Sequence, residues 1–179
     1  MALLLVSAAM ATLPTSADAE SAITAFYREH ASVVVIQQVA GIAALLAFVL
    51  FALSLDPNRW LRPAVFLFVV VELATNLVPL LILATPPAAG PLTRVEDLAD
   101  AALFVSVALF LVAATLRAPL WLRVMAYVVA AACVVRAIAS PLGITALDQI
   151  APLAFVAAAL VLSVRQLIAA PAPAAQPAR

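Results

Sequence analysis

The chain has few of the residue types on which soluble enzymes depend. It contains no lysine, one cysteine and three glycines, and only 10% of its residues are charged. The single cysteine, Cys133, excludes an intrachain disulfide and the paired ligands of the usual zinc sites. The sparse glycines form no Gly-rich loop, and a formal net charge of +0 leaves no basic patch for nucleic acid. We therefore expect no metal site, no cofactor and no nucleic-acid partner.

Apolar residues are abundant instead. They make up 68% of the chain, and the mean hydropathy is +1.22, whereas a typical soluble domain is roughly half apolar. Five apolar stretches have about the 20 residues that cross a bilayer: 32–55, 61–84, 93–116, 120–139 and 150–168. The sequence predicts an all-α, polytopic transmembrane helix bundle in the lipid bilayer, a single domain over residues 1–168, with a disordered Pro/Ala-rich tail at 169–179.

The apolar run at residues 2–13 is too short to span a membrane. One interpretation is a signal peptide cut after Ala17-Asp18-Ala19, although it lacks the positive residues that normally precede such a run. The other is a short or clipped first span, ahead of the five full ones. We favour the clipped span, and either interpretation places residue 20 on the same side of the membrane.

Several helix boundaries follow from local signals. Residues 18–31 place apolar side chains on one face, which predicts a short interfacial helix. The stretch TPPAAGP at 85–91 is expected to stop any helix. Thr93 and Glu96 match the capping box that opens the next one. Asp148, with Thr145, is a candidate cap for the last helix.

The arginines predict the orientation. Loops after the second and fourth spans, together with the tail, carry the larger share of them, so the positive-inside rule makes those loops and the C-terminus cytoplasmic in a multi-pass cell-membrane protein. The residues that decide this are Arg59, Arg62, Arg117, Arg123, Arg165 and Arg179, against Arg28, Arg94 and Arg136 on the other side.

The candidate site is centred on Glu72, in the middle of the apolar stretch 61–84. On a helix, Glu72, Asn76 and Pro79 share one face, and Pro79 leaves the Thr75 carbonyl without its usual partner. A charged group at this depth costs about 2.5 to 3.5 kcal/mol on insertion scales, and such groups usually face an interior or a water-filled path. Glu72 is the candidate catalytic residue, and the candidate ligand-binding residues of an outward-facing polar pocket are Gln37, Gln38, Asn76, Asp100 and Arg136.

The sequence leaves three functions open. The polar residues either tie helices together or bind a small, lipid-like molecule. Alternatively, Glu72 acts as the general acid of an intramembrane enzyme, or the chain is a structural subunit that associates through its helices into an oligomer. Ala154, Ala157 and Ala158 are candidates for such a small-residue face. Transport is disfavoured because the inward halves of the spans are nearly all apolar.

The stretch AFYREHASVVVIQQVAGIAALLAFVLFALSL at 25–55 resembles small, mostly actinobacterial multi-span membrane proteins of unknown function. The likeness covers the first third of the chain and implies six spans, the first lying ahead of this stretch. A fainter resemblance to integral-membrane terpene cyclases rests on Glu72 alone. No second acid matches that family, and the chain has fewer than the usual seven spans.

Overall fold

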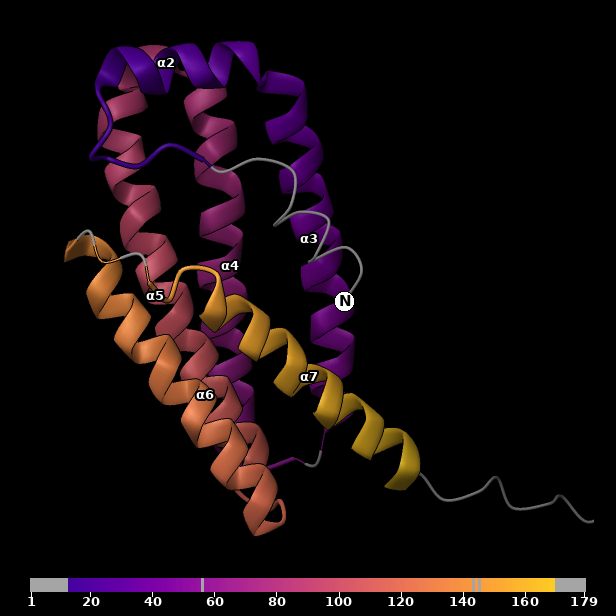
Figure 1. The fold of residues 1–179 in the computed structure, drawn as a ribbon. Helices are drawn as coiled ribbons and strands as arrows, with labels where there is room; N and C mark the ends of the chain where they lie inside the picture. The colour runs from indigo at the N-terminus through magenta and orange to yellow at the C-terminus, as the bar shows by residue number, and fades with distance from the viewer. Residues whose placement is uncertain (1–12, 56, 143, 145, 170–179) are drawn as a thin grey trace, which may run out of the picture.

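A computed structural model describes residues 13–55, 57–142, 144 and 146–169 as an all-helical bundle without strands (Figure 1). Five of the helices are long and apolar enough to cross a membrane. The predicted fold class is therefore confirmed, and we treat the chain as a multi-pass membrane protein. The α-helices are α2 (Glu20–Glu29), α3 (Ala31–Leu53), α4 (Leu61–Ala84), α5 (Ala89–Thr115), α6 (Leu120–Ala139) and α7 (Ile150–Ala169).

The long helices form a bundle in which α5 is central. It packs along α4 on one side and along α6 on the other, and α3 packs on α4. Helix α2 lies across one end of α3, α4 and α5, which we call the α2 end (Figure 1). Helices α6 and α7 lie toward the opposite end. The α2 end of the bundle is thus formed by α3, α4 and α5 under α2, and α6 and α7 join these helices toward the opposite end (Figure 1).

The part of the bundle away from α2 is held by an aromatic core to which four helices contribute. The ring of Phe48 on α3 lies 4.3 Å from that of Phe68 on α4 and 4.9 Å from that of Phe110 on α5, between centroids. Phe155 joins from α7 at 6.3 Å from Phe48. These separations are typical of favourable aromatic pairs, so the cluster fixes the positions of α3, α4, α5 and α7.

The α2 end has a separate, smaller apolar cluster. The buried Ile23 and Tyr27 of α2 pack there against the ends of α3, α4 and α5. The prediction of a short helix at 18–31 is thus confirmed, and its apolar face covers the end of the bundle. The other buried members of this cluster are Val34, Val78, Ile82 and Ala89.

The connection between α4 and α5 differs from the expectation. The prolines at 86 and 87 open a short 3-10 helix, Pro86–Ala88, and α5 begins directly after it at Ala89. Pro91 fits inside the first turn of α5 because the amide hydrogens there have no intrahelical acceptor. The capping-box prediction for Thr93 and Glu96 is therefore wrong: Thr93 is already inside the helix, and its hydroxyl donates to the Ala89 carbonyl at 2.9 Å.

Three predictions fall wholly or partly outside the described residues. They are the short or clipped span at 2–13, the tail beyond Ala169 and the contribution of Thr145 to a helix cap. Asp148 itself is described. It lies two residues before the first residue of α7, so it does not occupy the cap position.

Candidate functional site

Several charged and amide side chains of the membrane-spanning helices lie between the two apolar clusters. Along α3, α4 and α5, the residues near the α2 end belong to the small cluster and those further down belong to the aromatic core. The polar residues occupy the intervening turns. We call these residues the polar layer: Gln38 and Gly41 on α3, Glu72 and Asn76 on α4, Asp100 on α5 and Arg136 on α6.

Glu72 and Asn76 form a local unit on α4. The Asn76 amide donates to the Glu72 carbonyl at 2.7 Å and to its carboxylate Oε1 at 3.2 Å. Asn76 is buried, whereas Glu72 is partly exposed. Gly41 of α3 lies directly against the Asn76 side chain, with no room for a Cβ. The absence of a side chain at Gly41 therefore lets α3 approach α4 closely at the level of the acid.

Arg136 is the centre of the second unit. Its Nη1 lies 2.6 Å from Asp100 Oδ2, and its Nε lies 3.3 Å from Asp148 Oδ1. The guanidinium also stacks over the Phe104 ring, 3.7 Å from the centroid. The arginine side chain is 10% exposed, and those of the two aspartates are 39% and 31% exposed. One buried cation thus joins α5, α6 and the segment before α7.

The third unit ties α2 to the bundle. The Tyr27 hydroxyl donates to Glu96 Oε2 at 3.0 Å, and both side chains are buried. Burial raises the pKa of the Tyr27 phenol above its usual range, and the adjacent Glu96 carboxyl raises it further. The phenol therefore stays a proton donor. Nearby, the Ser16 amide donates to Asp97 Oδ2 at 2.9 Å, so the segment before α2 is also held by α5.

The structure brings together some of the predicted site residues. Glu72 and Asn76 are in contact, and so are Asp100 and Arg136. Arg136 pairs with Asp100 and Asp148, and neither ion pair includes Glu72. Gln38 is buried in α3 and Gln37 is partly buried beside it. The outward-facing pocket that these residues were expected to line stays a prediction.

Sequence reasoning missed the roles of Tyr27, Glu96 and Asp148. The first two carried a usable signal. Glu96, Asp100 and Phe104 recur every four residues and so share one face of α5. Tyr27 lies on the apolar face of its own short helix, where a buried hydroxyl needs a partner. The contact between Asp148 and Arg136 depends on how α7 returns to α6, which no local pattern encodes.

Comparisons with protein-family models, with curated proteins and with solved structures found no match for this chain.

Proposed function

We propose that this membrane protein is a non-catalytic subunit of a membrane assembly. In this proposal most of its intramembrane charges hold its own helices together. A helix of a partner chain packs against α4 at Glu72 and hydrogen-bonds to its carboxyl group. The observation that carries the proposal is the position of Glu72: a largely buried carboxyl in the middle of a span, hydrogen-bonded through one oxygen to Asn76.

The engagement of Arg136 supports this proposal. Arg136 is the buried cation of the described spans, and its guanidinium is already occupied by Asp100, Asp148 and the Phe104 ring. Glu72 therefore has no intrachain cation in contact with it among the described residues. Intramembrane carboxyls normally face a protein interior or water. We therefore expect the second carboxylate oxygen of Glu72 to bind a group that does not belong to the described residues.

The enzyme alternative receives less support from this geometry. A general acid needs an adjacent group to complete its proton cycle and an enclosed space for substrate. Two acids of α5 are already paired with other groups: Asp100 with Arg136, both in the polar layer, and Glu96 with Tyr27. Both contacts serve helix packing, which is the role proposed for these residues here.

Photo-crosslinking in native membranes tests the proposal. A photoreactive residue replaces Val69, which lies one turn before Glu72 on the same face of α4. The matched control is Val70 on the same helix, which is 47% exposed and lies two residues before Glu72, on roughly the opposite side of α4. We expect a crosslinked second polypeptide from Val69, of the same or another sequence, and about a threefold loss of it in Glu72→Ala, as an interhelical hydrogen bond of about 0.6 kcal/mol implies.

Other products would contradict the proposal. A crosslink within one chain, at the mass of the monomer, would mean that a segment of the chain itself covers Glu72. An adduct of small mass would favour the lipid-like ligand instead. Equal crosslinking from Val69 and Val70 would show unspecific contact rather than a helix docked at Glu72.

A further inference from the structure

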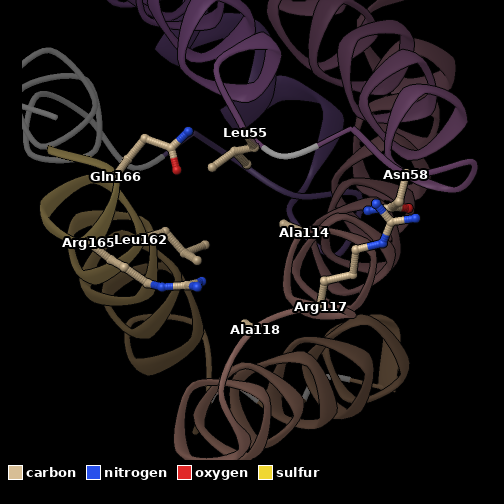
Figure 2. Close-up of a pocket in the computed structure, with 8 residues that line it drawn as sticks. All are labelled: Leu55, Asn58, Ala114, Arg117, Ala118, Leu162, Arg165 and Gln166. Atoms are coloured by element: carbon tan, nitrogen blue, oxygen red, sulfur yellow. The ribbon is translucent and has the colours of Figure 1, made fainter. Parts of the chain in front are cut away.

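A cleft lies at the end of the bundle opposite α2, where the α3–α4 connection, the end of α5 and the end of α7 meet (Figure 2). Its empty volume of about 370 Å³ includes the solvent at its mouth, and the space into which the centre of a water-sized sphere fits is about 20 Å³, so a larger group would lie at the mouth. The polar residues around it are Asn58, Arg117, Arg165 and Gln166, and Leu55 and Leu162 form its apolar floor. We call it the arginine cleft.

The two arginines come from opposite walls of this cleft. Arg165 extends from α7 toward its centre, whereas Arg117 follows the end of α5 and lies beside Asn58 (Figure 2). Arg117 donates to the Pro57 carbonyl at 3.3 Å, which uses one of the five donors of a guanidinium. Within the described ranges, neither arginine belongs to an ion pair. Both guanidinium groups therefore have donors available for an anion.

The polar neighbours of the cleft are already fixed by the fold. The Asn58 amide donates to the Ala113 carbonyl at 2.9 Å, and its side-chain oxygen accepts from the Trp60 amide at 3.0 Å. The Gln166 amide donates to the Ser54 carbonyl. These contacts hold the loop and the end of α7 in place. The loop and the end of α7 that line the cleft are thus held in place, and no acid of the described residues forms an ion pair with its two arginines.

The charge balance of this end favours an anion. The described segments at this end, 57–62, 115–123 and 163–169, carry five arginines and no acid. Asp56, the acid next to them in the sequence, lies outside the described residues. A guanidinium fork matches the oxygens of a phosphate group in both spacing and charge. Two such forks on opposite walls favour a phosphate held between them.

The apolar surroundings decide what carries the phosphate. Leu55 and Leu162 are buried beneath the cleft, 7% and 3% exposed. Directly after Arg165 and Gln166, the side chains of Leu167 and Ile168 are 78% and 80% exposed on α7. Apolar side chains this exposed beside a span indicate lipid contact, so the cleft opens at the boundary between hydrocarbon and water.

We propose that the arginine cleft binds the phosphate headgroup of an anionic phospholipid. The phosphate lies between Arg117 and Arg165, and the acyl chains follow the exposed apolar face of α7. Basic clusters at a membrane boundary attract anionic lipids in general. The cleft adds two arginines on opposite walls, which predicts one retained lipid per chain rather than a diffuse layer.

Native mass spectrometry of the full chain tests this proposal. The purified protein is titrated with phosphatidylglycerol, phosphatidylcholine or inorganic phosphate. The double variant Arg117→Gln/Arg165→Gln is compared with Arg59→Gln/Arg62→Gln, which removes the same charge at the same end. Arg59 stacks over Trp60, 5.1 Å from the ring centroid, and neither control arginine lines the cleft.

We expect one phosphatidylglycerol to bind per wild-type chain. Arg117→Gln/Arg165→Gln should bind it about tenfold more weakly, because this variant loses charge-assisted hydrogen bonds to the phosphate. The control variant should remain within about twofold of wild type, as a phosphate contact specific to the cleft requires. Arg117→Lys/Arg165→Lys keeps the charge without the fork, and its affinity should fall between the two. Thermal unfolding of each variant verifies that it is folded.

Three results would overturn the proposal. Equal losses in the cleft and control variants would show diffuse electrostatic attraction. Displacement of the lipid by millimolar inorganic phosphate would show a site for the free anion. Equal retention of phosphatidylcholine and phosphatidylglycerol would show that the negative charge of the lipid is not recognised.

Discussion

The contact between Gly41 and Asn76 shows how the lack of a side chain sets the distance between two membrane helices. A Cβ at position 41 would clash with the Asn76 side chain. Asn76 cannot move aside freely because its amide is held by the backbone carbonyl and the carboxylate of Glu72. The small residue therefore serves the polar layer as well as the packing of α3 on α4.

Gly41→Ala should accordingly destabilise the bundle by about 1–3 kcal/mol, the usual cost of overpacking. Gly90→Ala is the matched control, because its Cβ would meet the Glu20 carboxylate at a tolerable 3.3 Å. The free energy of unfolding in detergent micelles measures both. Asn76→Ala should reduce the penalty of Gly41→Ala in a double-mutant cycle; purely additive effects would refute the contact.

Tyr27 gives a second prediction at this scale. Tyr27→Phe leaves the buried Glu96 carboxyl without its donor, which should cost about 1–3 kcal/mol. The pKa of Tyr27 is raised in the folded protein, so the folded state keeps its proton above pH about 10, where an unfolded tyrosine loses it. The contribution is thus complete below pH about 10 and is lost as the pH rises further.

Unfolding measurements between pH 8 and 11 check the sign of this pH effect. Wild-type stability should fall more steeply than that of Tyr27→Phe above the ordinary tyrosine pKa of about 10. Tyr127→Phe is the matched control, since the other tyrosine is partly exposed on α6, 37% against 3% for Tyr27. Parallel curves for wild type and Tyr27→Phe would show that the phenol does not titrate differently on unfolding.

Among the helices, α5 is the element to which α2, α4 and α6 attach. Its acidic face binds α2 through Glu96, the segment before α2 through Asp97 and α6 through Asp100. Its lower half contributes Phe110 to the aromatic core. The helix therefore bridges the two apolar clusters, and the order of its acids along the sequence sets which neighbour is attached at which height.

Arg136→Gln should loosen the junction of α5, α6 and the segment before α7. Removing one partner of a fully buried ion pair costs 3–5 kcal/mol, but the two aspartates are 39% and 31% exposed, so we expect about 1–3 kcal/mol. Denaturant unfolding in micelles measures the loss. Adding Asp148→Asn should restore part of the stability by relieving the repulsion between two unpaired carboxylates, whereas a further loss would contradict this account.

The whole molecule has an orientation that the arginines predict and the helix arrangement alone does not show. Single cysteines in a Cys133→Ala background test it. Cys133 is fully buried, so its replacement removes background labelling with little change at the surface. Ser21→Cys near the α2 end should react with a membrane-impermeant maleimide in intact cells. Ser54→Cys at the opposite end should react only after permeabilisation; the reverse pattern would invert the orientation.

The sequence by itself determined the class of the protein and most of its elements. Hydropathy predicts the five spans because each must cover about the same hydrocarbon thickness whatever its neighbours are. Helix α4 was predicted at its observed bounds, 61–84. The proline-rich stretch correctly marked the end of α4 at Ala84. Local signals failed at the start of α5, which begins inside that stretch at Ala89, and Thr93 and Glu96, interpreted as its cap, lie within the helix.

Only the tertiary structure decided which polar groups meet. Gln37, Gln38, Glu72, Asn76, Asp100 and Arg136 could be selected from the sequence, because polar residues are costly in hydrocarbon. Their pairing could not, since it depends on helix rotation and relative height. The structure assigns Arg136 to Asp100 and Asp148 instead of Glu72, and joins Tyr27 to Glu96 across 69 positions of the chain. The local sequence predicts how deep each polar residue lies in the membrane, whereas the packing of the helices decides which polar residues contact one another.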